Sequence, residues 1–146
     1  MPELFFKTPM GSKPQDDKGK VYDLIILGGG PAGLSAALYA GRARLDTLLI
    51  EKNLPGGQSM ITDWVENYPG FPEGITGLEL AKKFEDHARK FGTKIILEEV
   101  VEVDLKSEPK IIKTSQGEYR AHAIILATGN EPRKLGIPGE EKFKGR

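Results

Sequence analysis

The sequence contains no cysteine. This absence excludes a disulfide framework, a thiol nucleophile and a cysteine-based metal site within these 146 residues. Histidine is almost as scarce, with only His87 and His122. Neither histidine belongs to an obvious metal set or catalytic triad, so we interpret both as structural residues. The lack of cysteine is also compatible with a reducing compartment, and we expect a cytoplasmic protein.

The sequence also lacks an excess of either charge and lacks long apolar runs. Lys+Arg and Asp+Glu each number 21, so the formal net charge is zero. This balance does not favour binding to nucleic acid or to an anionic membrane surface. The longest apolar runs, such as residues 123–127, are far shorter than the ~20 residues of a membrane-spanning helix. We therefore expect neither a nucleic-acid partner nor a membrane.

The N-terminal segment lacks the features of a signal peptide. Residues 1–20 are polar, contain three prolines, and have neither a long apolar core nor a small-residue cleavage site. We predict that they form a flexible extension, with a partner contact as the alternative.

Glycine is abundant, with 18 residues, which indicates tight turns and close approaches of the backbone to a ligand. An apolar run over residues 21–27 predicts a strand buried on both faces of a parallel sheet. Leu34, Ala37, Leu38 and Gly41 then recur at helical spacing. A second strand over 47–50 completes a βαβ unit, so the fold class is α/β.

The rest of the chain reads as a long loop followed by a helix and several strands. Glycines and prolines divide residues 53–77, and a loop of this length in a compact domain is usually functional. Thr76 and Glu79 have the spacing of a capping box, so a helix begins there, and Gly92 can end it. Further strands are predicted over 93–97, 100–105 and 111–114, the last in a hairpin with 119–120, and a final buried strand over 122–127.

The three glycines after the first strand carry the strongest functional signal. Gly28, Gly30 and Gly33 fit G-x-G-x-x-G between a predicted strand and a predicted helix, which is the context that gives this motif weight. Gly28 permits the turn, Gly30 lets the backbone approach a pyrophosphate, and Gly33 lets helix and strand pack closely. Pro31 fits the first helical turn, whose N–H groups and positive dipole face the phosphates.

An acidic residue follows the second strand at the position that such a motif requires. Glu51 can accept hydrogen bonds from the two ribose hydroxyls of an adenosine, and its charge would repel a 2′-phosphate. The alternative is a surface glutamate beside Lys52. The complete strand, turn, helix, strand and acid set favours dinucleotide binding, but it does not separate FAD from NAD.

Several stretches in order resemble the FAD domain of thioredoxin reductases, a branch of the pyridine nucleotide–disulfide oxidoreductases. They are GGGPAGLSAALYAGRARLDTLLIEK from residue 28, Gly56-Gly57-Gln58, VENYPG over 65–70, Val103-Asp104-Leu105, Ala127-Thr128-Gly129 and GEEKFKGR over 139–146. The resemblance implies a Rossmann-like FAD/NAD(P)-binding three-layer fold with a central parallel sheet and a β-meander, here truncated. It assigns residues 21–130 to the first segment of the FAD-binding domain.

The resemblance also implies a set of cofactor-binding residues. Gly57 and Gln58 would lie along the FAD pyrophosphate and ribityl chain, and Asn67 would reach the flavin. Ile61 and Thr62 would lie nearby, and Val100 would offer backbone groups to the adenine. Together with the motif residues, the expected FAD site comprises Gly28, Gly30, Pro31, Ala32, Gly33, Glu51, Lys52, Gly57, Gln58, Ile61, Asn67, Val100, Thr128 and Gly129. None of these residues is expected to be catalytic, and no metal site is expected.

The sequence departs from this family in one large respect. Family members continue after a Phe-Lys-Gly-Arg stretch into an NADPH domain with a Cys-x-x-Cys pair, whereas here residues 131–146 resemble only the start of that linker. We therefore expect a fragment, inactive alone, of an enzyme that moves electrons from NADPH through FAD to a disulfide. Thioredoxin or a similar disulfide protein would be its partner, and a homodimer is expected. The alternatives are a thioredoxin-reductase-like ferredoxin–NADP reductase and a non-catalytic nucleotide-binding module.

Overall fold

The chain folds around one mixed β-sheet with two long helices. The computed structural model describes residues 19–131 and 133–143. The predicted N-terminal extension over 1–20 lies almost entirely outside the described residues. The elements are β1 (Val21–Leu27), α1 (Pro31–Arg42), β2 (Thr47–Glu51), the 3₁₀ helix η1 (Gly57–Ile61), α2 (Gly77–Lys90), β3 (Lys94–Leu97), β4 (Val100–Asp104), β5 (Lys110–Thr114), β6 (Glu118–Leu126) and the short α3 (Glu140–Phe143).

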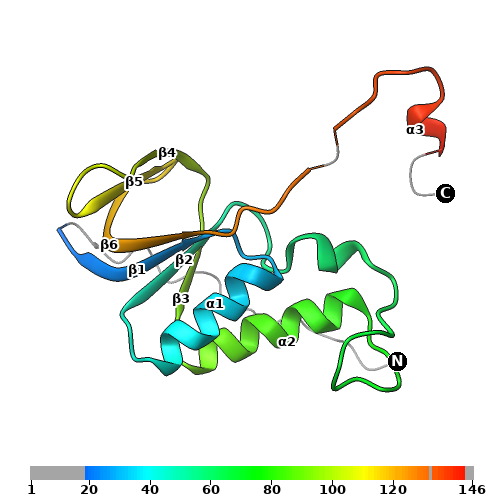
Figure 1. Ribbon diagram of the computed structural model, residues 1–146, viewed down its shortest axis with the longest axis horizontal. Coiled ribbons are helices and arrows are strands. Elements are labelled where there is room, and N and C mark those ends of the chain that lie inside the picture. Colours follow the sequence, from blue (N-terminus) through cyan, green and yellow to red (C-terminus); the bar gives the residue numbers. More distant parts are fainter. Residues whose placement is uncertain (1–18, 132, 144–146) are drawn as a thin grey trace.

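The sheet has the strand order β3-β2-β1-β6-β5-β4 (Figure 1). The strands β3, β2, β1 and β6 run parallel, and β4 and β5 continue from β6 as antiparallel strands. From β1 the chain first moves outward on one side to β2 and β3. It then crosses to β4 at the far edge of the other side and comes back through β5 to β6, beside β1. The space above the carboxyl ends of β1, β2 and β6 is thus a topological switch point, where open α/β sheets bind ligands.

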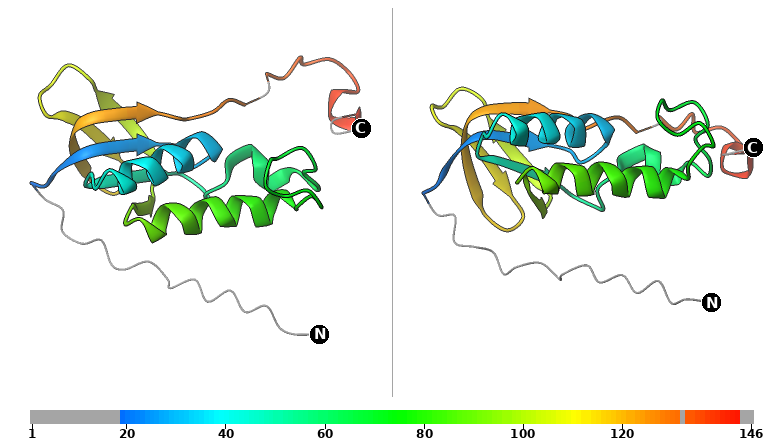
Figure 2. Two further views of the ribbon diagram at one scale, coloured as in Figure 1. Left: turned by 60° about the horizontal axis from the view of Figure 1, so that its bottom comes forward. Right: turned by 90° about the horizontal axis from the view of Figure 1, so that it is seen from below.

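Two apolar clusters cover the two faces of the parallel strands. On one face, α1 and α2 pack together on the sheet (Figure 2), through a cluster of Leu24, Ile26, Leu34, Ala37, Ala40, Leu49, Ala88 and Ile95. On the other face, Ile112 of β5 and Ala121 of β6 join a cluster with Tyr22, Ile25, Leu27, Leu48 and Ile50. Adjacent residues of one strand thus enter different clusters, because side chains alternate across a sheet. The predicted α/β architecture with a parallel sheet and a β-meander is confirmed.

The last strand corrects one prediction. The sequence suggests a hairpin strand over 119–120 and a separate buried strand over 122–127, but one strand, β6, covers both. Its beginning pairs with β5 and nearly its whole length pairs with β1. Its end is not buried, since Ile125 is 38% and Leu126 is 61% exposed. The helices lie over β1–β3, and within the described residues no apolar layer covers the end of β6.

The long loop over 53–77 holds more regular structure than its sequence predicts. It contains η1 and a two-residue bridge in which Val65 and Ile75 exchange both backbone hydrogen bonds, at 2.8 and 2.9 Å. The amide of Gly77 donates to the carbonyl oxygen of Thr62 at 3.0 Å, which ties the end of this loop to the start of α2. The bridge between Val65 and Ile75 and the hydrogen bond from Gly77 to Thr62 have no periodic sequence signal, because both join residues far apart in the loop.

The start of α2 is fixed by the capping box that the sequence predicts. The Thr76 hydroxyl accepts a hydrogen bond from the Glu79 amide at 3.2 Å, and the Glu79 carboxylate reaches back to the Thr76 amide at 3.4 Å. Each contact satisfies a backbone donor that the helix itself leaves unpaired.

We predict that Thr76→Ala lowers the free energy of unfolding by about 1 kcal/mol, because it removes this cap. Urea denaturation followed by circular dichroism measures the change. Thr62→Ala is the matched control, because that threonine is exposed and its described contacts are made by its backbone. Equal stability of the Thr76→Ala protein and the unaltered chain would contradict the assignment.

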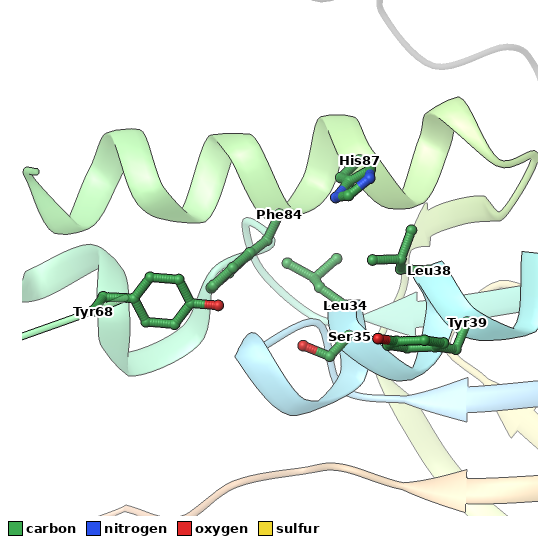
Figure 3. A pocket seen from close by; sticks show the side chains of 7 residues that line it. All are labelled: Leu34, Ser35, Leu38, Tyr39, Tyr68, Phe84 and His87. Carbon is green, nitrogen blue, oxygen red and sulfur yellow. The ribbon is translucent and has the colours of Figure 1, made fainter. Parts of the chain in front are cut away.

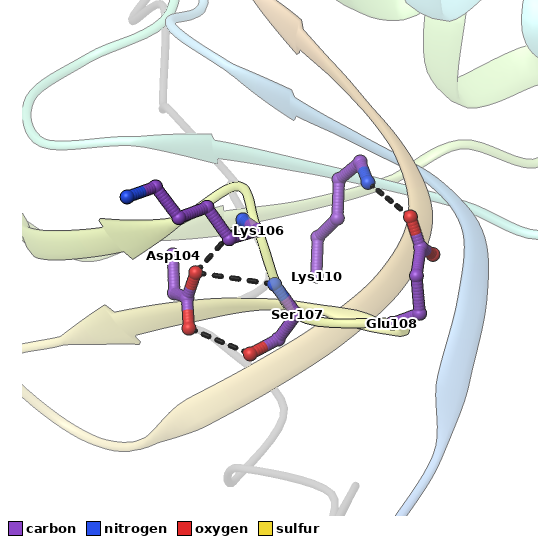
Figure 4. A network of polar contacts seen from close by, with 5 residues as sticks. All are labelled: Asp104, Lys106, Ser107, Glu108 and Lys110. Carbon is purple, nitrogen blue, oxygen red and sulfur yellow. Dashed lines mark hydrogen bonds and ion pairs between the residues drawn. The ribbon is translucent and has the colours of Figure 1, made fainter.

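The turn between β4 and β5 is organised by one carboxylate (Figure 4). Asp104 accepts hydrogen bonds from the Ser107 hydroxyl at 2.6 Å and from the amides of Lys106 and Ser107 at 2.8 and 3.2 Å. These donors, with the serine hydroxyl first among them, lower the pKa of Asp104 below its ordinary value of 3.8, because they stabilise the charged form.

A depressed carboxyl pKa in the folded state stabilises the fold only while the group is ionised. We predict that Asp104→Asn destabilises the chain at neutral pH, and that the difference from the unaltered chain shrinks as the pH falls through the lowered pKa. Urea denaturation at neutral and at acidic pH tests this. A difference that is constant with pH would show that the carboxylate charge contributes nothing.

Candidate functional site

A large cavity lies at the carboxyl ends of β1, β2 and β6, at the topological switch point. Its volume is about 880 Å³. Three chain segments surround it: the turn from β1 into α1, the segment from the end of β2 through η1, and the segment that follows β6. Its lining comprises Gly28, Gly30, Pro31, Ala32, Glu51, Lys52, Asn53, Leu54, Gly57, Gln58, Met60, Ile61, Leu97, Ala127, Thr128, Gly129, Asn130 and Glu131.

The glycines of the turn are held by different constraints. Gly28 has a φ of +104°, and a Cβ there would overlap the carbonyl of Ala127 at the end of β6. A Cβ on Gly33 would overlap the carbonyl oxygen of Gly28, so α1 begins in direct contact with the turn. At Gly30 no atom lies within 4 Å of the Cβ position. Gly28 and Gly33 are therefore required by the protein itself, whereas Gly30 faces open space in the cavity.

The start of α1 presents backbone donors to this space. Leu34 donates to the Gly30 carbonyl at 2.9 Å, which is the first hydrogen bond of the helix. The amides of Ala32 and Gly33 precede it and have no acceptor within the helix, and Pro31 has no amide proton. Amide protons and the positive end of the helix dipole together favour an anion such as a phosphate at this position.

Glu51 is held in place by backbone amides from both sides. Its Oε2 accepts a hydrogen bond from the Gly29 amide at 2.6 Å, and its Oε1 accepts one from the Asn53 amide at 2.9 Å. A Cβ on Gly29 would lie 3.1 Å from the Cβ of Glu51, so the turn and the acid are also in close contact. The carboxylate is thereby fixed at the edge of the cavity, with unused lone pairs that can accept hydrogen bonds from a ligand.

The segment after β2 folds back over the glycine turn. Gly56 donates to the carbonyl oxygen of Gly29 at 2.7 Å, and a Cβ on Gly57 would lie 3.0 Å from the Cα of Gly30. Ser59 donates from its hydroxyl to the carbonyl of Gly56 at 2.6 Å, which closes the first turn of η1. This segment therefore forms a second wall of the cavity, directly beside Gly30.

Two polar contacts join this wall to the segment that follows β6. The Gln58 side-chain amide donates to the carbonyl of Asn130 at 3.4 Å, and Lys52 pairs with Glu131 at 3.5 Å. Both pairs are exposed, so each contributes little to stability. They show how close the two segments approach across the opening of the cavity.

The sequence-predicted residues divide into those that line the cavity and those that do not. Gly33 lies just behind the lining, where it supports the turn. Asn67 and Val100 lie outside this lining, and so does Thr62. The structure brings the other eleven predicted residues together, namely Gly28, Gly30, Pro31, Ala32, Glu51, Lys52, Gly57, Gln58, Ile61, Thr128 and Gly129.

The sequence missed part of the lining. Asn53, Leu54, Met60, Leu97, Ala127, Asn130 and Glu131 also face the cavity. Most of these residues are next to a predicted residue in the sequence. That adjacency is the signal that could have found them. Leu97 could have been found from the end of its predicted strand, because parallel strands meet at one edge.

A second, smaller cavity of about 260 Å³ lies between α1 and α2 (Figure 3). Its lining is Leu34, Ser35, Leu38 and Tyr39 from α1, Phe84 and His87 from α2, and Tyr68 from the long loop. The rings of Tyr68 and Phe84 meet edge to face with centroids 5.7 Å apart. His87 packs on Phe91 with centroids 5.6 Å apart, in keeping with a structural role.

The larger cavity is built for binding. Its titratable lining residues are Glu51, Lys52 and Glu131, and within the described part of the chain no group of three or more potential metal ligands occurs. An anion-binding turn, a fixed carboxylate and apolar walls suit a dinucleotide, whereas no lining group is paired as a nucleophile with a base.

None of the helices that the structure describes is long and apolar enough to cross a membrane.

Known proteins are similar to this chain in sequence and in fold. Residues 22–146 match the family described as pyridine nucleotide-disulphide oxidoreductase. Over 127 residues the chain is 50% identical to a thioredoxin reductase of Bacillus subtilis, covering 87% of this chain and 40% of that protein. The chain therefore spans about two fifths of the length of the curated relatives it matches.

Solved structures agree with this match. The crystal structure of Lactococcus lactis thioredoxin reductase (FR conformation) superposes with a TM-score of 0.77 at 42% identity, covering 86% of this chain and 41% of that one. A ferredoxin-flavin thioredoxin reductase from Clostridium acetobutylicum superposes with a TM-score of 0.68 at 35% identity, covering 86% and 43%.

Two alanine substitutions in the glycine turn separate folding from binding. We predict that Gly33→Ala destabilises the chain by about 3 kcal/mol, because its Cβ would force α1 away from Gly28. Gly30→Ala should change stability by no more than about 1 kcal/mol, since its φ of −71° suits alanine and its Cβ meets no atom. It should nevertheless abolish nucleotide binding. Urea denaturation and calorimetric titration with ADP measure both effects, and unchanged ADP affinity in the Gly30→Ala protein would contradict the prediction.

Proposed function

Because this chain belongs to the pyridine nucleotide-disulphide oxidoreductase family, we propose that residues 21–130 form the FAD-binding segment of a thioredoxin reductase. The observation that carries the proposal is the open space at Gly30. A Cβ would collide with the protein at Gly28 and Gly33 but meets nothing at Gly30, which lines the cavity at the start of α1, where the amides of Ala32 and Gly33 have no acceptor within the helix. This is the arrangement that the pyrophosphate of a dinucleotide requires.

The residues around the cavity fit the parts of FAD. The turn and the start of α1 would hold the pyrophosphate, and the fixed carboxylate of Glu51 would accept hydrogen bonds from the adenosine ribose. Gly57, Gln58 and Ile61 in the second wall, and Thr128 and Gly129 after β6, would flank the rest of the cofactor. Lys52, near the acid, would supply a cation beside the phosphates.

Three residues outside this lining or behind it keep narrower roles in the proposal. Gly33 would act by holding α1 against the turn. Asn67, exposed in the long loop, would reach the flavin end, and the backbone of Val100 would face the adenine. Bound FAD supplies the redox chemistry, whereas these residues bind and orient it.

In the whole enzyme, we propose, electrons pass from NADPH through FAD to a disulfide, with thioredoxin or a similar protein as acceptor. The Bacillus subtilis relative supports this choice through its name and its 50% identity. A homodimer in the cytoplasm, active in redox homeostasis, completes the proposal. This chain alone would bind cofactor without turnover, because none of its cavity residues is a thiol or a paired base.

One observation favours a second candidate for the electron donor. The Clostridium acetobutylicum structure, named a ferredoxin-flavin thioredoxin reductase, shares this fold over 86% of the chain. A FAD segment of this kind is therefore compatible with ferredoxin in place of NADPH as the source of electrons.

We predict that the 146-residue chain, incubated with FAD and passed through a gel-filtration column, elutes with flavin absorbance. Glu51→Gln should weaken FAD affinity about tenfold, because hydrogen bonds to a charged carboxylate are replaced by neutral ones. Glu73→Gln is the matched control, with the same change of charge on an exposed loop residue outside the cavity. Elution of the unaltered chain free of flavin, together with no binding of ADP, would overturn the proposed function.

A further inference from the structure

A buried carboxylate directly follows Leu97, one of the residues that line the cavity. Glu98 follows β3 and is only 8% exposed. Its Oε1 accepts a hydrogen bond from the Tyr119 hydroxyl at 2.8 Å, and its Oε2 accepts one from the Thr114 hydroxyl at 2.6 Å. Within the described residues, every buried side-chain nitrogen or oxygen has a hydrogen-bond partner, so this group is satisfied.

The two donors fix Glu98 from both strands of the adjoining hairpin. Thr114 ends β5 and Tyr119 lies near the start of β6. Thr114 is itself oriented, because its hydroxyl accepts hydrogen bonds from the amides of Gln116 at 3.2 Å and Gly117 at 3.0 Å. An apolar side chain would avoid the free energy of burying a carboxylate, but it would not select one position of the chain as hydrogen bonds of fixed direction do.

The backbone of Glu98 connects this network to the cavity. Its amide donates to the carbonyl oxygen of Glu51 at 2.9 Å, one residue beyond the pairing of Glu51 with Leu97 at the ends of β2 and β3. Glu51 is the residue whose carboxylate bonds to Gly29 in the turn. Leu97 lines the cavity beside it. Glu98 is thus joined to Glu51 by one backbone hydrogen bond and to Leu97 as its neighbour in the chain. Glu51 and Leu97 shape one end of the cavity.

We propose that Glu98 is a positioning residue for the adenosine end of the dinucleotide site. Held by Tyr119 and Thr114, it fixes the chain between β3 and β4, and it thereby fixes the end of β2 from which Glu51 reaches the ligand. Glu98 does not touch the ligand; it acts through Glu51. The inference rests on the proposed function, because it concerns the same cavity.

The test is a double-mutant cycle measured by calorimetric titration with ADP, on the full 146-residue chain. Glu98→Ala should weaken ADP binding about tenfold. In a Glu51→Gln background the same substitution should weaken it by less than about twofold further, because Glu98 then has no carboxylate to position. A merely structural role would give the same loss in both backgrounds.

Two further variants serve as controls. Glu98→Gln keeps the shape of the side chain, and its amide can hydrogen-bond to both hydroxyls, so ADP affinity should stay within about twofold of the unaltered chain. Ile112→Val weakens the apolar cluster against which Tyr119 packs, and it leaves the hydrogen bonds of Glu98 in place. It should also leave ADP affinity within about twofold. If Glu98→Ala does not fold, Tyr119→Phe replaces it in the cycle, since it removes one of the two donors.

The outcomes separate this inference from the proposed function. If the unaltered chain does not bind ADP, the proposed function fails and this inference fails with it. If the unaltered chain binds ADP but Glu98→Ala binds it equally well, or if the two losses are additive, only the positioning role is overturned. A tenfold loss that disappears in the Glu51→Gln background establishes it.

Discussion

The contact between α1 and the turn that precedes it constrains the rest of the structure. The helix begins so close to Gly28 that any side chain on Gly33 would overlap the Gly28 carbonyl, and Gly28 in turn lies against the carbonyl of Ala127. This arrangement ties the helix to the ends of both β1 and β6. It also leaves the first-turn amides of α1, which have no acceptor within the helix, beside Gly30, where a Cβ would meet no atom within 4 Å. The capacity to bind a ligand at Gly30 thus follows from close packing at Gly28 and Gly33, on either side of it in the sequence.

Sheet topology determines where that binding capacity can be used. β1 lies between β2 and β6, so the chain leaves it in one direction and returns on the other side. The segments that follow these strands surround a cavity of about 880 Å³. The acid at the end of β2 and the turn at the end of β1 are neighbours across this gap, joined by the 2.6 Å hydrogen bond from the Gly29 amide to Glu51. One carboxylate therefore stabilises the turn and offers acceptors to a ligand.

The hairpin of β5 and β6 gives this region its second support. It contributes Ile112 and Ala121 to the sheet face opposite the helices, and it supplies the hydroxyls that hold Glu98. Apolar packing alone sets the distance between layers, whereas the Glu98 network sets the position of one strand end along the chain. This segment is similar both to a thioredoxin reductase and to a ferredoxin-flavin thioredoxin reductase, which is consistent with a segment specialised for holding a cofactor.

Local sequence determined much of this protein. Residues 21–27, the glycine motif, the strand at 47–50 and the capping box at Thr76 each carry a signal within a few positions, because their conformations depend on backbone sterics, side-chain period and local hydrogen bonds. The α/β class and the part of the cavity lining at the glycine turn and Glu51 followed from them, whereas Gly57, Gln58, Ile61, Thr128 and Gly129 were implied only by the family resemblance. Only the tertiary structure decided that residues 118–126 form one strand with an exposed end, since burial depends on whether another layer lies above. It alone joined Glu98 to Tyr119 and to Glu51, because those contacts bring together residues 21 and 47 positions apart, and no local pattern encodes a distance of that kind.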